Sequence, residues 1–222
     1  KTDMFAGSSG SIATTVCASP VFLPQSKKEL KSAVDAYLNL SPQGDGSNCP
    51  HGPIGEWDVS RVTDMSGIFR DVILFNGDIS KWDVSRVTDM SEIFYGAATF
   101  EGDISKWDVS RVTDMHRMFQ GALTFNGDLS TWDVSNVKNM NGMFTSAHKF
   151  NGDISKWDVS SVTGMAFMFE GATSFNTDIS NWDVSSVTDM SGMLFKAASF
   201  NQKLCGAAWV NSKASKQNMF VG

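Results

Sequence analysis

Cysteine is scarce in this sequence, and no two cysteines have the spacing of a metal site. Only Cys17, Cys49 and Cys205 occur among 222 residues, and none of them belongs to a CxxC motif. A zinc site or thioredoxin-like chemistry is therefore not expected. The count allows one disulfide, for which Cys17 and Cys49 are the candidates, and such a bond would agree with an oxidising compartment.

An excess of basic residues and long apolar runs are also lacking. Lys and Arg number 18 against 24 Asp and Glu, which gives a net charge of −6. A nucleic-acid partner is not expected, because phosphate binding requires a basic face. No run of about 18 apolar residues occurs, so no transmembrane segment is predicted. The hydrophobic content of 41% nevertheless predicts a packed protein.

Tryptophan, in contrast, recurs at a constant interval of 25 residues. The tryptophans that follow this interval are Trp57, Trp82, Trp107, Trp132, Trp157 and Trp182. The nonapeptide WDVSRVTDM is repeated letter for letter from the first three of them. A period of this length is typical of solenoids, in which each coil contacts its neighbours. We predict six coils, and we call residues 25 apart in successive coils a column.

Columns that stay apolar indicate the core. In the second coil they contain Ile79, Trp82, Val84, Val87, Met90, Ile93, Phe94, Ala97 and Phe100. The alternation of apolar and polar residues over 82–84 predicts a short strand, and the spacing of Met90, Ile93 and Phe94 predicts a short helix. The predicted fold class is therefore an α/β solenoid whose six coils stack short parallel strands beside short helices.

Segments outside the repeat are predicted to close the ends of the stack. The segment 26–40, SKKELKSAVDAYLNL, combines a Ser-x-x-Glu capping box with apolar residues at helical spacing. It predicts an amphipathic helix that covers the first coil. Residues 1–52 then form an N-terminal cap segment, 53–204 the repeats and 205–222 a C-terminal cap.

The repeat carries a resemblance to a known family. The pattern DISxWDVSxVTDMSxMFxGAxxFNG, over 54–204, resembles the BspA-like surface-protein repeat, a divergent leucine-rich repeat. The resemblance implies a leucine-rich-repeat-like solenoid at the cell surface, with a role in adhesion and protein binding. It says nothing about the N-terminal 50 residues.

Motifs of catalysis are absent from the sequence. There is no P-loop, no GxGxxG after a predicted strand and no HExxH. His116 stands in the column of Ser91 and His148 in that of Ala98, and His51 precedes the repeats, so stacking does not gather the histidines. We predict that the protein is not an enzyme and has no cofactor.

Aspartate recurs in three columns that stacking would bring together. One candidate metal site is the column Asp78, Asp103, Asp128, Asp153 and Asp178. Calcium binds carboxylate oxygens, but the spacing of a calcium-binding loop is absent. The alternative is that each aspartate accepts hydrogen bonds from nearby backbone amides in an Asx turn. We favour the Asx turn and keep calcium as the alternative.

A second aspartate column loses its basic neighbours toward the C-terminus. Arg86 is replaced in later coils by Asn136, Ser161 and Ser186, so the acidic residues there lack counter-charges. These residues are Asp133, Asp158 and Asp183. They predict a partner with a basic surface, and the charges would affect the rate and selectivity of association more than the affinity.

Two other columns change residue type from coil to coil. The column of Glu92 contains Phe167, and the column of Tyr95 contains Phe195. On the predicted helix the two columns share a face, which would place Phe167 near Phe195. Exposed aromatics often dominate binding energy. Tyr95, Phe167 and Phe195 are therefore the predicted partner-binding aromatics.

The sequence as a whole predicts a non-catalytic protein-binding or scaffold module. It would act through an extended repeat surface, as a surface adhesin or as a peripheral subunit of a larger assembly. The alternative function is ion binding or a structural role of the aspartate rows. An extracellular or cell-surface location is favoured, with an oxidising organelle lumen as the alternative.

Overall fold

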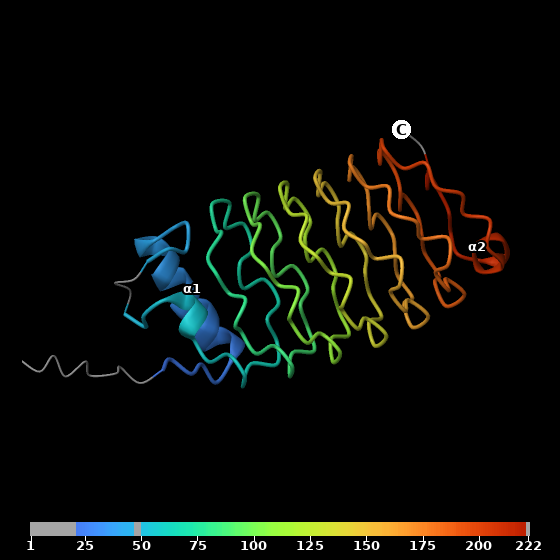
Figure 1. Ribbon diagram of the computed structural model, residues 1–222. Coiled ribbons are helices and arrows are strands. Elements are labelled where there is room, and N and C mark those ends of the chain that lie inside the picture. The colour runs from blue at the N-terminus through green and yellow to red at the C-terminus, as the bar shows by residue number, and fades with distance from the viewer. Residues whose placement is uncertain (1–20, 47–49, 221–222) are drawn as a thin grey trace, which may run out of the picture.

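The computed structural model describes residues 21–46 and 50–220. The chain forms a row of stacked coils, with the helix α1 against the first coil and the helix α2 beside the last (Figure 1). Successive coils are joined through parallel bridges between residues 25 or 26 apart. The bridged pairs run from Asp64 with Asp89 through Asp89 with Asp114, Asp114 with Asn139, Asn139 with Gly164 and Gly164 with Asp189 to Asp189 with Ser215.

Regular secondary structure is confined to the two ends of the described chain. The elements are α1 at Lys27–Leu40, a 3₁₀ turn η1 at Ile54–Glu56 and α2 at Ala207–Asn211. Within residues 21–46 and 50–220 the bridges are isolated and no β-strand forms. The predicted α/β fold, a leucine-rich-repeat-like solenoid with parallel strands and short helices, is therefore wrong. None of the helices described is long and apolar enough to cross a membrane.

Left-handed residues prevent the predicted helix in each coil. Glu92 has a φ of 56° and Gly96 a φ of 68°, which a right-handed helix cannot accommodate. As a result, successive backbone amides alternate between acceptors in the same coil and in the next. The amide of Ile93 donates to the carbonyl of Met90 within the coil, whereas the amide of Phe94 donates at 3.0 Å to the carbonyl of Met118 in the next coil. The segment is a chain of tight turns that also bonds to its neighbour, although its apolar spacing is that of a helix.

The predicted strand fails although its pattern of burial is correct. Trp82 and Val84 are buried and Asp83 is exposed, as the alternation requires. The amide of Trp82, however, closes a turn on Ile79. The link to the preceding coil comes from the indole instead, because Trp82 Nε1 donates 2.8 Å to the carbonyl of Ile54. The same bond recurs for Trp107, Trp132, Trp157, Trp182 and Trp209.

Two columns of phenylalanine run through the core. Phe94 stacks on Phe119 of the next coil at 5.5 Å between ring centroids, and Phe100 stacks on Phe125 at 5.9 Å. Within one coil Phe94 also stacks on Phe100 at 4.0 Å. All four rings are fully buried. Rings of this size bury large apolar areas, so stacking supplies the hydrophobic stabilisation that one coil cannot provide alone.

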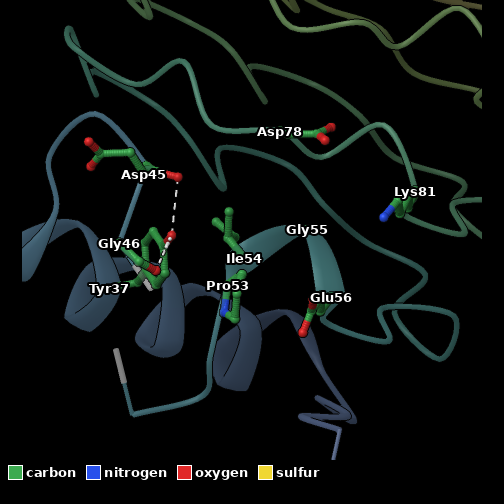
Figure 2. A pocket seen from close by; sticks show the side chains of 10 residues that line it. Tyr37, Asp45, Gly46, Pro53, Ile54, Gly55, Glu56, Asp78 and Lys81 are labelled. Carbon is green, nitrogen blue, oxygen red and sulfur yellow. Dashed lines mark hydrogen bonds between the residues drawn. The ribbon is translucent and has the colours of Figure 1, made fainter. Parts of the chain in front are cut away.

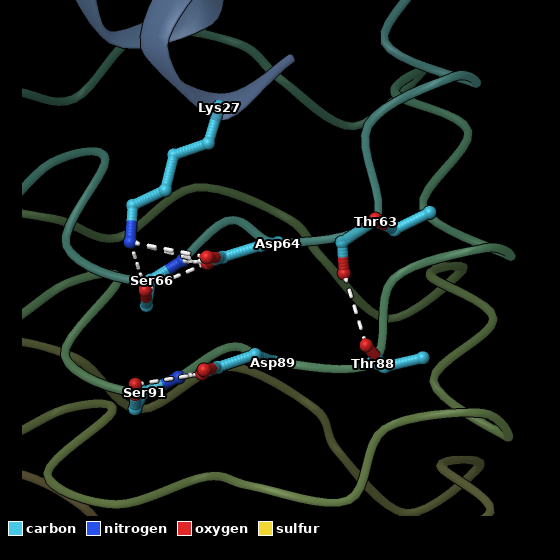
Figure 3. Close-up of polar contacts among 7 residues, drawn as sticks. All are labelled: Lys27, Thr63, Asp64, Ser66, Thr88, Asp89 and Ser91. Carbon is cyan, nitrogen blue, oxygen red and sulfur yellow. Dashed lines mark hydrogen bonds and ion pairs between the residues drawn. The ribbon is translucent and has the colours of Figure 1, made fainter.

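The N-terminal helix closes one end of this core. Ser26 Oγ caps α1 by accepting from the amide of Glu29, as the sequence motif predicts. Leu30, Val34 and Tyr37 are buried against the first coil, where the ring of Tyr37 meets Trp57 edge-on at 5.6 Å. On its outer side, the Nζ of Lys27 reaches Asp64 Oδ1 at 3.2 Å (Figure 3). The helix is thus placed by apolar burial and one ion pair.

The segment after Leu204 continues the repeat in modified form. Trp209 Nε1 donates to the carbonyl of Ile179, as the earlier tryptophans do to theirs. Ser215 makes the last parallel bridge, and Asn218 has the left-handed φ of 55° that recurs in each coil. The short helix α2 stands between these features.

Candidate functional site

The columns that vary most form one face of the stack, which we call the variable face. It comprises the column Gly67, Glu92, Arg117, Gly142, Phe167, Gly192 and the column Arg70, Tyr95, Gln120, Thr145, Glu170, Phe195. Every member of the first column has a left-handed backbone, with φ between 51° and 65°. Glycine adopts this conformation without strain, whereas side chains with a Cβ do so at a cost. Non-glycine residues in this column therefore stand out.

Charged residues organise the first three coils of the variable face. Arg70 forms an ion pair with Glu92, and Arg117 Nη1 lies 3.8 Å from Glu92 Oε1. The guanidinium of Arg70 also covers the ring of Tyr95, 4.7 Å from its centroid. Ion pairs at the surface contribute little to stability. Their consequence here is that the predicted binding residue Tyr95 presents a ring already covered by Arg70.

Aromatic residues dominate the last two coils of the variable face. The side chain of Phe167 is 47% exposed, and its ring lies over Gly192 of the next coil. Phe195 is half-buried, with Lys196 Nζ 5.1 Å from its ring centroid. The helix from which we predicted their proximity is absent. The turn that begins at Gly192 contains Phe195, whose amide donates to the carbonyl of Gly192, the residue beneath the ring of Phe167.

Each recurring aspartate caps the turn that follows it. Asp153 Oδ1 accepts from the amide of Ser155 at 3.0 Å and from its hydroxyl at 2.7 Å. Asp89 Oδ1 does the same with Ser91 at 2.9 and 2.7 Å (Figure 3). The other members of the candidate metal column accept the amide two residues on: Asp78, Asp103, Asp128 and Asp178. These are the Asx turns that the sequence favours over calcium.

Hydrogen bonds lower the pKa of every aspartate in the candidate metal column, although like charges stack beside them. In Asp128 the hydroxyl and amide of Ser130 lower the pKa, and they outweigh the charges of Asp103 and Asp153, which raise it. The pKa of Asp183 is lowered in the same way by Ser185 against the charge of Asp158. The hydrogen bonds thus outweigh the repulsion between neighbouring coils.

The acidic residues predicted to bind a partner form a second surface, apart from the aromatics. Asp133, Asp158 and Asp183 are exposed, and each accepts the amide of the serine two residues on at 3.0 Å. Asp133 lines a shallow hollow with Asp128, Asp108 and Lys106. No residue of the variable face lines this hollow. The structure therefore divides the predicted binding residues between two surfaces.

Neither a metal site nor the predicted disulfide is visible in the described chain. Within residues 21–46 and 50–220, no three His, Cys, Asp or Glu side chains are close enough together to hold a metal ion. Cys17 and Cys49 lie outside the described residues. Cys205 is exposed and its thiol is free.

A second hollow, of about 230 Å³, lies between the N-terminal cap and the first two coils (Figure 2). Asp45, Glu56, Asp78 and Lys81 contribute its charged groups. The hydroxyl of Tyr37 donates to the carbonyl of Gly46 at 2.9 Å and fixes one wall. The hollow therefore has a net negative charge, and sequence reasoning missed it because it depends on how the cap docks.

Exposed aliphatic residues at one corner of the coils were also missed. Ile73 and Leu74 are 60% and 52% exposed, and Leu123 is 40% exposed. Ile73 and Leu123 share a column with Ala98, which the amides of Thr99 and Thr124 link from coil to coil. The sequence did indicate this exposure: the same column has the polar residue His148 in the fourth coil, and a column that accepts a polar residue does not belong to the core.

Comparison with known proteins adds a family to this geometry. Searches of the curated proteins and of the solved structures returned no match. A family model matches twice, over residues 43–149 and 126–222, which together cover most of the chain. The chain belongs to the family described as Mycoplasma protein of unknown function, DUF285.

Proposed function

We propose that the protein is a non-catalytic module that binds a partner protein through its variable face. One observation carries the proposal. Phe167 is 47% exposed and has a φ of 58°, in a column where three of the six coils have glycine. A bulky side chain in this conformation destabilises the fold by about 1 to 3 kcal/mol, and such residues gather at functional sites. An exposed aromatic ring that lowers the stability of the fold is best explained by a role in binding a partner protein.

The stack provides a rigid support for such a face. The amide of Phe167 donates 2.9 Å to Ser191 of the following coil, and the amide of Phe169 donates 2.9 Å to Met193. A backbone bonded in this way loses little further freedom on binding, which favours affinity. Large aromatics at the centre of an interface often carry much of its energy. Phe167 and Phe195 are the proposed anchors.

A basic partner surface suits the rest of the molecule. The net charge is −6, and Asp133, Asp158 and Asp183 are exposed on their own surface. Complementary charge of this kind speeds encounter and excludes acidic competitors more than it tightens the complex. The resemblance of the repeat to BspA-like surface proteins supports a place at the cell surface or outside the cell. A peripheral position in a larger assembly, or an oxidising organelle lumen, is the alternative.

Cross-linked co-purification tests the proposal. The purified protein is used as bait under native conditions, and cross-links are mapped to its columns. We expect them to concentrate on the variable face, and we expect Phe167→Gly to abolish capture while the protein stays folded. Leu123→Ser, which alters the exposed aliphatic corner, is the matched control. Capture lost with Leu123→Ser and retained with Phe167→Gly would contradict the proposal.

A further inference from the structure

A small hollow opens on the variable face at the fourth coil. It has a volume of about 120 Å³ and is bounded by Arg117 of the third coil and Phe167 of the fifth. Between them the left-handed column has Gly142, which places no side chain over the floor. The hollow is thus made by the glycine, where the neighbouring coils have long residues.

Hydrogen-bond acceptors point into the space above Gly142. A Cβ on Gly142 would lie 3.3 Å from Thr145 Oγ1 and 3.6 Å from Gln120 Oε1. The hydroxyl of Thr145 already donates its proton to the carbonyl of Phe167, at 2.7 Å. Because a hydroxyl has one proton, Thr145 presents only lone pairs to the hollow.

Two further groups in the hollow lack a partner. The carboxylate of Glu170 is half-buried, and it makes no hydrogen bond or ion pair within the described chain. His116 Nδ1 is buried and also has no partner there. Buried polar atoms without partners are rare in folded proteins, because each one loses its bonds to water without compensation, and this applies to His116 Nδ1. The carboxylate of Glu170 is only partly buried, so a donor placed in the hollow can bind it in place of water.

The basic residue at the rim does not neutralise this site. Arg117 Cγ lies 3.2 Å from the point that a Cβ on Gly142 would occupy, so its aliphatic part forms the wall. Its charged end, Nη1, lies 3.8 Å from Glu92 Oε1 of the second coil. Glu92 is shared with Arg70, so these three side chains keep one positive charge at the rim, and Glu170 supplies the negative charge beside the hollow.

We propose that the hollow at Gly142 binds an arginine side chain of the partner protein. This inference rests on the proposed function and names the chemistry of one contact. A guanidinium has a positive charge and five N–H donors in one plane. It matches the carboxylate of Glu170 and the acceptors of Gln120 and Thr145, while Ala166 and Phe167 offer apolar surface to its methylene groups. The net charge of −6 favours the approach of such a residue.

Two small probes test the site without the partner. N-acetyl-arginine amide and N-acetyl-citrulline amide have nearly the same shape, but only the first is charged. We expect the arginine probe to shift the backbone amide resonances of Gly142 and Glu170 saturably, with millimolar affinity. Citrulline should bind at least about tenfold more weakly. Equal binding of the two, or no saturable shift with arginine, overturns the proposal.

Variants of the left-handed column provide matched controls. Gly142→Asn fills the hollow with a residue type that adopts the same left-handed conformation at Asn218, where φ is 55°. Gly67→Asn makes the same change in the first coil, where the nearest atom to a new Cβ lies 3.8 Å away. We expect Gly142→Asn and Glu170→Gln to weaken arginine binding about tenfold or more, and Gly67→Asn to leave it unchanged. Unchanged binding in Gly142→Asn overturns the proposal.

The outcome is separable from that of the proposed function. If Phe167→Gly abolishes partner capture while the arginine probe fails to bind, the variable face binds its partner and only the arginine site is wrong. If the probe binds as expected while capture does not depend on Phe167, the arginine site stands and the assignment of the anchor is wrong.

Discussion

The ring of Phe167 lies over Gly192 of the next coil, so that a Cβ on Gly192 would stand 2.5 Å from ring carbons. Both residues have left-handed backbones, with φ of 58° and 62°. The glycine thus relieves its own backbone and also leaves room for the ring. Phe167 is a proposed binding residue and Gly192 serves the fold, so variants of this pair can separate the two roles.

Replacing Phe167 by glycine should stabilise the protein. The change removes a bulky side chain from a left-handed position, and we expect the free energy of unfolding in urea to rise by about 1 kcal/mol. Phe167→Ala is the control, because it removes the ring but keeps a Cβ in the strained conformation. A clear loss of stability in Phe167→Gly would show that the ring packs for stability, and would weaken its assignment to binding.

Replacing Gly192 by alanine should destabilise the protein, and more so in the presence of Phe167. The new Cβ meets both the left-handed backbone and the ring, so we expect a loss of about 1 to 3 kcal/mol. In a double-mutant cycle with Phe167→Gly, part of this loss should disappear, with a coupling of at least about 0.5 kcal/mol. Gly67→Ala, which has a similar φ of 65° and no ring nearby, should show the backbone effect alone.

The core columns could be predicted from the sequence, but the backbone between them could not. Apolar residues at Met90, Ile93 and Phe94 have the spacing of a helix, and a chain of tight turns buries the same positions. The distinguishing signal is glycine at one of two left-handed positions four residues apart, as in Gly142 before Ser146 and Gly96 after Glu92. Because the glycine changes position from coil to coil, neither column shows it throughout.

The residues of the candidate site could be predicted from the sequence only in part. Phe167 and Phe195 were identified because they break their columns, which sequence reasoning detects well. The hollow at Gly142 was missed because it arises from a missing side chain between two long ones. Such a feature depends on the packing of neighbouring coils, and the sequence of a single coil does not predict it.

Replacing Trp132 by phenylalanine should show how much each indole bond contributes. Trp132 Nε1 donates 3.2 Å to the buried carbonyl of Ile104, which would keep only its bond from the amide of Trp107. A lost hydrogen bond costs about 0.5 to 1.5 kcal/mol, and the smaller ring adds a cavity. Trp57→Phe is the control, since its acceptor on His51 is near solvent and can bind water. Equal losses in urea unfolding for the two variants would contradict this account.

Calcium should leave the melting temperature unchanged. The column from Asp78 to Asp178 uses its Oδ1 atoms to cap turns, as in Asp128, which accepts from the amide of Ser130 at 2.9 Å. A ligand that binds only the folded state raises its stability with concentration, so a melting scan with millimolar calcium and with chelator is decisive. A rise that disappears in Asp128→Asn would instead establish a calcium site in this column.

Acid should destabilise the protein through its aspartate turns. Nine aspartates have a pKa lowered mainly by the serine two residues on: Asp58, Asp78, Asp103, Asp108, Asp128, Asp153, Asp158, Asp178 and Asp183. A carboxyl whose pKa is lower in the folded than in the unfolded state stabilises the fold above its unfolded pKa of about 3.9. That stability is lost as pH falls through the folded pKa. Urea unfolding should therefore show a steep loss below about pH 4.

Ser155 provides the sharpest test of this pH dependence. Its hydroxyl donates 2.7 Å to Asp153 Oδ1 and is the largest cause of the lowered pKa of that carboxyl. In Ser155→Ala the pKa of Asp153, followed by NMR, should rise toward its ordinary value, and the loss of stability in acid should become less steep. Asp153→Asn should remove this group's share of the pH dependence, while the amide oxygen still caps the turn, as Asn139 does for Asn141. An unchanged slope in both variants would mean that the carboxyls near Asp153 titrate alike in the folded and unfolded chain.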